Sequence, residues 1–286
     1  MIIKTPAKIN FFLYITGKRP DGYHELISLM STIGLYDILH FNFNCNNLQV
    51  TTNNPLIPEN EENIAYTAAS LFLKELKIKN GIHISIEKNI PSGAGLGGGS
   101  SNAACVLKTL NKYYNYPLTN QQLMSLGLSI GADVPFFIFN KSAIVSGIGE
   151  KCNYYNGKLP DYTVIIYPGI EISTKTIFKN FNLKLTNSKK QNICTLLNDS
   201  EYSIIKLLNN DLEQICFRLF PDVEKAKKML IKFGAYKSLM TGSGASVYGL
   251  FNSMKEAQFA KREIQKTIIN LKYNKWEVFD CPINPI

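Results

Sequence analysis

A glycine-rich stretch is the part of this sequence whose residue types most directly suggest chemistry. Residues 90–102 read IPSGAGLGGGSSN and place five of the chain's 19 glycines within seven positions. Before it, alternation over residues 82–87 predicts a strand. After it, apolar residues at helical spacing over 103–113 predict a helix, which Ser100, Ser101 or Asn102 could cap. A strand, a glycine loop and a helix N-terminus in this order favour phosphate binding.

Three common phosphate loops are excluded by residues that the sequence lacks. A P-loop ends in Gly-Lys-Ser or Gly-Lys-Thr, whereas this loop ends in Gly99-Ser100-Ser101. The spacing of Gly93, Gly95 and Gly98 matches a dinucleotide site, but no acidic residue occurs from position 88 to position 132 to hold a ribose. The H-R-D and D-F-G signatures of protein kinases do not occur.

Other polar residues could act beside such a loop. Lys8 and Asn10 lie on the same side of a strand predicted over residues 6–15, because strand side chains alternate. Tyr23 and His24 follow a Pro-Asp-Gly turn, either as an ordinary surface hairpin or as a platform for a base. Asp133 is the first acid after position 87, and it is either a turn former or a catalytic carboxylate.

Composition narrows the class of protein. The 286 residues, 45% hydrophobic and 19% charged, are typical of a globular protein with one large or two medium domains. No run of 18 apolar residues and no secretory signal is present, so we expect a cytoplasmic protein that does not span a membrane. The six cysteines form no C-x-x-C pair and are expected to be reduced. The net charge of +9 is compatible with an anionic small-molecule substrate, and its scattered lysines do not favour a nucleic-acid site.

The elements that must position these residues follow from the hydrophobic pattern. Strands are expected over 27–43, 48–52, 134–139, 143–149, 163–167, after the small-residue loop 241–246, and over 275–279; helices are expected over 63–76, 119–128, from 173 onward, and over 204–219, 223–233 and 255–270. Residues 184–192 are interpreted as a polar loop, and residues 154–161 as a candidate domain boundary. Such alternation predicts an α+β or α/β architecture.

Three segments in this order resemble the signatures of the GHMP small-molecule kinases: residues 6–10 (PAKIN), 91–101 (PSGAGLGGGSS) and 241–246 (TGSGAS). Within that family, residues 22–26 (GYHEL) and 131–136 (GADVPF) look like those of the 4-diphosphocytidyl-2-C-methyl-D-erythritol kinases. The similarity covers nearly the whole chain. A homoserine-type or mevalonate-type kinase of the same family is the alternative, although it leaves residues 22–24 unexplained. A non-catalytic nucleotide-binding or RNA-binding protein is the alternative from another class.

The resemblance implies an α+β fold of two domains. Residues 1–157 would form an ATP-binding domain with a ribosomal S5 domain 2-like fold. Residues 158–286 would form a substrate-binding, ferredoxin-like domain with an antiparallel sheet, and the active site would lie between the two. The implied reaction transfers the γ-phosphoryl group of ATP to the 2-hydroxyl of the diphosphocytidyl methylerythritol, and Mg²⁺ is expected to assist it.

The resemblance also implies residue roles. Asp133 would be the general base and Lys8 its cationic partner. ATP would contact Pro91, Ser92, Gly93, Ala94, Gly95, Leu96, Gly97, Gly98, Gly99, Ser100 and Ser101, with Asn63 near the adenine. The alcohol substrate would contact Asn10, Tyr23, His24, Thr174, Phe178, Gly242 and Ser243. The metal ligands and the oligomeric state stay open, and Ser100 and Ser101 are the hydroxyls nearest in sequence to an expected metal.

Overall fold

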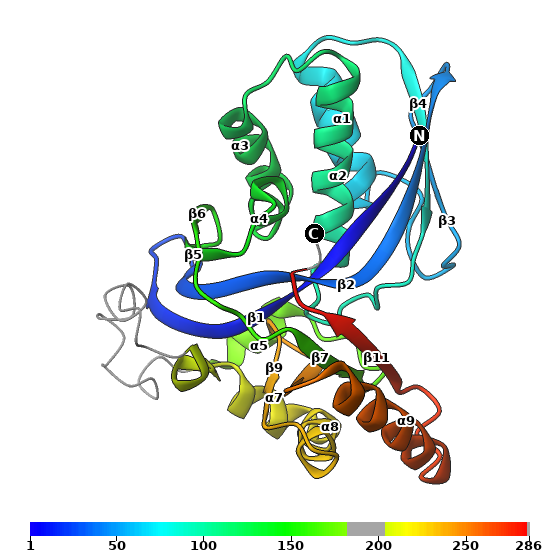
Figure 1. Ribbon diagram of the computed structural model, residues 1–286. Helices are drawn as coiled ribbons and strands as arrows, with labels where there is room; N and C mark the ends of the chain where they lie inside the picture. Colours follow the sequence, from blue (N-terminus) through cyan, green and yellow to red (C-terminus); the bar gives the residue numbers. More distant parts are fainter. Residues whose placement is uncertain (182–203, 285–286) are drawn as a thin grey trace.

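A computed structural model describes residues 1–181 and 204–284 of the chain. The polar loop expected over residues 184–192 and the sixth cysteine, Cys194, lie outside these ranges. In the described residues, two sheets pack with helices on their outer faces, as Figure 1 shows. Most strand pairs are antiparallel, so the predicted α+β class is confirmed.

The larger sheet is built around two long strands. They are β1 (Ile2–Lys18) and β2 (His24–Cys45), which form an antiparallel hairpin across the turn at residues 19–23. The sheet has the order β3-β4-β2-β1-β8, and β5 joins β2 to β6. The remaining strands are β3 (Gln49–Thr52), β4 (Gly81–Glu87), β5 (Ala143–Gly147), β6 (Lys151–Tyr154) and β8 (Asn209–Asn210).

Four helices cover one side of this sheet (Figure 1). They are α1 (Ile64–Glu75), α2 (Gly98–Tyr113), α3 (Asn120–Ile130) and α4 (Val134–Phe139). Helix α3 begins with a capping box, in which the Thr119 hydroxyl accepts from the backbone N–H of Gln122 while the Gln122 side chain accepts from the backbone N–H of Thr119. The helix predicted over residues 119–128 is therefore confirmed, and it extends to Ile130.

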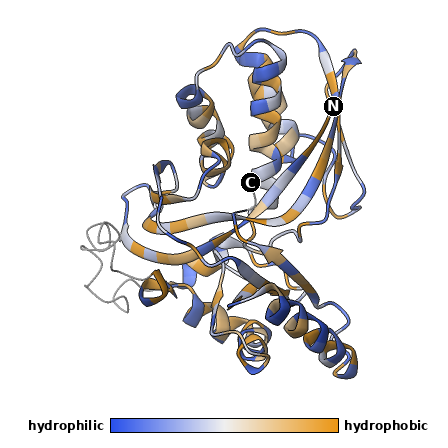
Figure 2. Ribbon diagram, in the orientation of Figure 1, coloured by the Kyte–Doolittle hydropathy of each residue, from blue (hydrophilic) through white to orange (hydrophobic). Residues whose placement is uncertain are grey.

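The smaller sheet has four antiparallel strands in the order β11-β7-β10-β9. Its strands are β7 (Tyr162–Tyr167), β9 (Lys237–Met240), β10 (Val247–Phe251) and β11 (Glu277–Pro282). The accompanying helices are α5 (Thr174–Asn180), α7 (Glu213–Leu219), α8 (Pro221–Lys232) and α9 (Met254–Asn270). Along β2, residues 33–41 alternate between buried and half-buried positions. Figure 2 shows hydrophobic and hydrophilic residues mixed along this long strand.

The two halves of the chain share part of their core. Strand β1 is buried continuously from Ala7 to Leu13 because both of its faces are covered. Its apolar residues belong to the same cluster as strands β7 and β10. Strand β8 pairs with Phe12 and Leu13, and Ile283 forms a bridge with Ile33. The division of the chain at residues 157 and 158 stays a prediction.

Three local predictions were wrong, each because a short-range signal was overridden. Residues 134–139 form helix α4 rather than a strand: Pro135 suits the first turn of a helix, and periodicity does not separate a short buried helix from a buried strand. Helix α2 begins at Gly98 after an N-cap at Gly97, so residues 100–102 lie inside its first turns and do not cap it. The helix expected over 204–219 is broken into a 3₁₀ turn at Ile204–Leu207, strand β8 and helix α7. Asn210 accounts for this break, since its side-chain oxygen accepts from the backbone N–H of Leu212.

Candidate active site

A cavity of about 1040 Å³ lies where the glycine loop, the middle of β1 and the loop between β9 and β10 meet. Nearly all residues predicted to form a site line it: Lys8, Asn10, Tyr23, His24, Asn63, Pro91, Ser92, Gly93, Ala94, Gly95, Gly97, Gly98, Gly99, Ser100, Asp133, Thr174, Phe178, Gly242 and Ser243. Leu96 and Ser101 do not, because their side chains are buried behind the cavity wall. The structure therefore places these residues, which range from position 8 to position 243, around one cavity.

The cavity floor is formed by Lys8, Asn10 and Asp133. The Lys8 ammonium lies 3.5 Å from a carboxylate oxygen of Asp133 and donates to the Asn10 side-chain oxygen at 2.8 Å. Lys8 is only 3% exposed, whereas the Asp133 side chain is 30% exposed. Asp133 stands at the N-cap of α4 but makes no capping hydrogen bond to that helix. Its carboxylate is therefore directed at Lys8 and the cavity, where it could accept a proton.

The glycine loop packs directly on this floor. The backbone N–H of Lys8 donates to the carbonyl oxygen of Leu96 at 2.9 Å. Gly95 has φ +76, and a Cβ there would lie 2.3 Å from the carbonyl oxygen of Thr241. Gly97 has φ +71, and a Cβ there would lie 3.0 Å from Lys8 and Phe137. Only glycine fits these two positions, and the chain passes from them into the N-terminus of α2, where backbone N–H groups favour an anion.

The loop at Thr241–Ser246 connects the glycine loop to the floor. The Thr241 hydroxyl lies 3.1 Å from the Asn10 side-chain oxygen and 3.3 Å from the carbonyl oxygen of Gly95. The backbone N–H of Ser246 donates to the carbonyl oxygen of Ala94 at 3.0 Å. Asn210, a residue that the sequence reasoning missed, donates to the carbonyl oxygens of Met240 and Gly242. No motif marks Asn210, because only the tertiary fold brings β8 to this loop.

The part of the cavity beside Asn63 is lined by apolar residues. Ile57, Pro58, Ile64 and Ile86 line it together with Asn63. The Asn63 side chain has a structural role there, since its oxygen accepts from the backbone N–H of Ala65 to cap α1 and its amide donates to the carbonyl oxygen of Pro58. The four apolar residues were missed because isolated isoleucine and proline carry no functional signal in a sequence.

The cavity rim is formed by Tyr23, His24 and Phe178. Tyr23 is 61% exposed at the hairpin turn of β1 and β2. His24 and Phe178 stack with ring centroids 4.9 Å apart and planes at 27°. Partial burial, and secondly the charge of Lys18, lowers the pKa of His24 below its usual 6.5. Beside the rim, the hydroxyls of Thr174 and Ser243 lie 2.9 Å apart.

No group of three or more His, Cys, Asp or Glu side chains that could enclose a metal ion occurs in residues 1–181 and 204–284. Ser100 lines the cavity, and its hydroxyl lies on the side of Gly131, two residues before Asp133. A single hydroxyl and a nearby carboxylate suit a Mg²⁺ ion that is bound mainly by phosphate oxygens and water. In the part of the chain that the structure describes, no helix is both long and apolar enough to cross a membrane.

Comparison with sequence models of known families decides the family. The model described as the GHMP kinases N terminal domain matches residues 63–141, which contain the glycine loop and Asp133. The model of the GHMP kinases C terminal domain matches residues 195–270, which contain the loop 241–246. The chain belongs to the GHMP kinase family.

Similar proteins within the GHMP kinase family agree with this assignment. A 4-diphosphocytidyl-2-C-methyl-D-erythritol kinase of Geobacter sp. (strain M21) is 42% identical over 263 residues, which are 92% of this chain and 93% of the relative. A crystal structure of 4-(cytidine 5'-diphospho)-2C-methyl-D-erythritol kinase superposes with a TM-score of 0.79 and 30% sequence identity. The match covers 100% of this chain and 100% of that chain. A homoserine kinase from Cytophaga hutchinsonii has a TM-score of 0.75 at 18% identity, covers 98% and 93% of the two chains, and shows the shared fold alone.

Proposed function

We propose that this chain transfers the γ-phosphoryl group of ATP to the 2-hydroxyl of 4-diphosphocytidyl-2-C-methyl-D-erythritol, a step in the non-mevalonate route to isoprenoid precursors. The relatives named above support the choice of substrate. The observation that carries the mechanism is the Lys8–Asp133 pair, 3.5 Å apart on the cavity floor and directly below a glycine loop.

Asp133 is the general base of the proposed reaction. Its carboxylate takes the proton of the 2-hydroxyl while the hydroxyl oxygen forms a bond to the γ-phosphorus, and the bond from that phosphorus to the bridging oxygen of ADP breaks. Lys8, 3.5 Å from that carboxylate, stabilises the negative charge that collects on the transferred group. Asn10 holds the Lys8 ammonium in place and helps to position the alcohol.

The glycine loop and the start of α2 bind the phosphates of ATP in this proposal. Residues of the loop and of the first turn of α2 line the cavity, and their backbone N–H groups would donate to the phosphates along the proposed contacts from Pro91 to Ser100. The apolar end near Asn63 receives the adenine. Mg²⁺ fits beside Ser100, and when bound it neutralises charge on the β- and γ-phosphate oxygens.

The rim selects the cytidine end of the substrate. Tyr23 and Phe178 offer aromatic faces for the cytosine, and His24 offers a ring nitrogen for hydrogen bonding. Because His24 and Phe178 are stacked directly, we propose that the entering cytosine separates them. Thr174, Gly242 and Ser243 lie between the rim and the floor, where the diphosphate would pass. We further propose that residues 1–157 form the nucleotide-binding domain and residues 158–286 the substrate-binding domain.

One assay tests the proposal. ADP release is measured with the purified chain, ATP and Mg²⁺, and with equal concentrations of the diphosphocytidyl alcohol, mevalonate or homoserine. Of the three alcohols, we expect only the diphosphocytidyl alcohol to give ADP release. Its product should be heavier by one phosphoryl group, which is attached to the 2-hydroxyl. Turnover with homoserine or mevalonate instead would replace the substrate assignment. Salt-sensitive RNA binding without ADP release from any alcohol would favour the non-catalytic alternative.

A further inference from the structure

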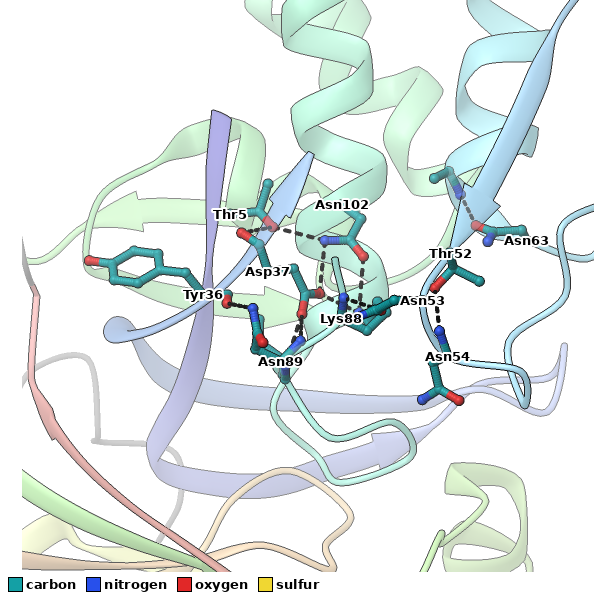
Figure 3. A network of polar contacts seen from close by, with 12 residues as sticks. Thr5, Tyr36, Asp37, Thr52, Asn53, Asn54, Asn63, Lys88, Asn89 and Asn102 are labelled. Atoms are coloured by element: carbon teal, nitrogen blue, oxygen red, sulfur yellow. Dashed lines mark hydrogen bonds and ion pairs between the residues drawn. The ribbon is translucent and has the colours of Figure 1, made fainter. Parts of the chain in front are cut away.

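A buried carboxylate lies beneath the glycine loop and is not used by the proposed reaction. Asp37 is on β2, directly opposite Thr5 of β1 in the hairpin register, and its side chain is fully buried. Figure 3 shows it at the centre of a network of polar contacts. Such a charge is stable in a protein interior only when its oxygen atoms are paired.

Both oxygens of Asp37 are paired twice. One accepts from the backbone N–H groups of Asn89 and Ile90, each at 2.8 Å. The other accepts from the Lys88 ammonium in a short contact and from the side-chain amide of Asn102 at 3.0 Å. The Lys88 side chain is only 6% exposed, so this is a buried ion pair with its hydrogen bonds satisfied.

These partners come from the two ends of the glycine loop. Residues 88–90 lead into the loop, which starts at Pro91. Asn102 lies on α2, which begins at Gly98 where the loop ends. Asn102 also accepts from Lys88 at 3.0 Å and donates to the hydroxyl of Thr5 at 2.8 Å. One carboxylate thus fastens the entry and the exit of the loop to the β1–β2 hairpin, which carries Lys8.

The loop between these two points needs such support. Gly93, Gly95 and Gly97 have positive φ, and glycine loses more conformational freedom on ordering than any other residue. A loop that binds phosphate through backbone N–H groups binds more tightly when those groups are already in place. We propose that Asp37, Lys88 and Asn102 form a clamp that holds the glycine loop in its phosphate-binding shape, and that they are positioning residues for ATP.

The clamp acts through geometry rather than through net charge. Lys88 lines the cavity, and its ammonium lies 3.4 Å from where a Cβ of Gly98 would stand. Asp37 neutralises that ammonium, so the pair adds little net attraction for phosphate. The rim residues Tyr23 and Phe178 are not part of the clamp. Weakening it therefore affects the nucleotide and leaves recognition of the alcohol unchanged.

Asn102→Ala is the most direct test, because it frees α2 from the clamp and leaves the Asp37–Lys88 pair intact. The inference rests on the proposed function in taking ATP as the ligand of the loop. The Kd of a non-hydrolysable ATP analogue and the KM for ATP should rise about tenfold, the effect of losing a hydrogen bond to a charged group. We expect kcat and the KM for the alcohol to change by less than about threefold.

The matched control is Asn111→Ala on the same helix. Asn111 is 4% exposed against 3% for Asn102. Its side chain makes two hydrogen bonds against three for Asn102, and both join the backbone of Leu118 at the far end of α2. We expect this variant to lower the Tm while the Kd of the analogue stays at the wild-type value. Equal Kd values for Asn102→Ala and Asn111→Ala, with similar losses of Tm, would overturn the clamp and leave a purely structural network.

A milder variant keeps the test decisive if Asn102→Ala does not fold. Thr5→Val preserves shape but removes the hydroxyl that accepts from Asn102. It should raise the Kd of the analogue in the same direction by a smaller factor, about threefold, and an unchanged Kd would contradict the inference. Analogue binding is measured without any alcohol. A wild-type chain that binds the analogue but phosphorylates no diphosphocytidyl alcohol would therefore refute the proposed function and not the clamp.

Discussion

The cavity floor and the cavity rim differ in how their side chains are held. On the floor, Lys8 and Asn10 are 3% and 1% exposed. Lys8 is held by an ion pair with Asp133 and a hydrogen bond to Asn10, and the Asn10 side chain is held by hydrogen bonds to Ser28 and Thr241. At the rim, Tyr23 is 61% exposed, and its backbone N–H donates to the carboxylate of Asp21, two residues away. The side chains of Lys8 and Asn10 are thus held in place by buried contacts, whereas Tyr23 at the rim has room to rearrange.

This difference matches the two tasks that the site combines. Phosphoryl transfer depends on charges that are positioned in advance, because reorganising them during the reaction would raise the barrier. Choosing an alcohol depends on contacts that form as the substrate enters. A family that shares one reaction and differs in substrate would then keep its floor and vary its rim. Substitutions on the floor should affect turnover, and substitutions at the rim should affect the KM for the alcohol.

The largest effect is expected on the floor. Asp133→Asn keeps the size of the side chain but removes its ability to take a proton, so kcat should fall by about 10² to 10⁴, the usual span for a general base. The Kd of a non-hydrolysable ATP analogue should change little. Asp222→Asn, the same substitution on the exposed face of α8, serves as the control and should leave both constants unchanged. Wild-type kcat in Asp133→Asn would remove the proposed base.

A smaller effect is expected at the rim. Tyr23→Ala removes an exposed aromatic face, so the KM for the diphosphocytidyl alcohol should rise about tenfold, in line with the contribution of stacking on one base. The KM for ATP and kcat should change much less. Tyr23→Phe keeps the ring and should stay close to wild type. A parallel rise in both KM values would show that Tyr23 does not distinguish the two substrates, and the contrast between floor and rim would fail.

Sequence reasoning predicted the site residues that lie in recognisable local motifs. The strand alternation that put Lys8 and Asn10 on one side is confirmed by the 2.8 Å hydrogen bond between their side chains. Asp133 follows a long acid-free stretch, which left it open as a turn former or a catalytic carboxylate, and the resemblance chose the second; its carboxylate lies 3.5 Å from Lys8. The strand alternation can be read along the chain alone, whereas the choice for Asp133 also needed the family resemblance.

What sequence reasoning missed depends on tertiary contacts. Asp37 sits in an ordinary strand, and nothing nearby in the sequence reveals that Lys88 and Asn102 meet it. Asn210 interrupts a helix pattern, and its side chain donates hydrogen bonds to the carbonyl oxygens of Met240 and Gly242, about thirty residues later. Helix propensity depends on neighbouring residues and cannot predict such a contact. The short apolar run at 134–139 fits a strand or a buried helix equally well, and packing against α2 and α3 decides in favour of the helix.

The smallest predicted effect concerns the protonation of His24 at the rim. Burial is the main cause that lowers its pKa below 6.5, and the charge of Lys18 adds to it. The folded protein therefore favours the neutral imidazole. Its contribution to stability is present above pH 6.5 and is lost as the pH falls below that value toward the lowered pKa. Because the ring is partly exposed, solvent screening keeps the contribution small.

The pH dependence of the KM for the diphosphocytidyl alcohol should reveal the protonation of His24. The KM for the diphosphocytidyl alcohol should rise a few-fold as the pH falls from about 7.5 to about 5.5, because a protonated His24 cannot accept a hydrogen bond. His24→Gln removes the titrating group, so the ratio of wild-type to variant KM isolates its effect from the titration of the nucleotide. Lys18→Gln removes a nearby positive charge and raises the pKa of His24, which moves the rise in KM to higher pH. An unchanged profile in Lys18→Gln together with an unchanged profile in His24→Gln would mean that the acidic loss of affinity arises elsewhere, and the rim would then bind the cytidine by stacking alone.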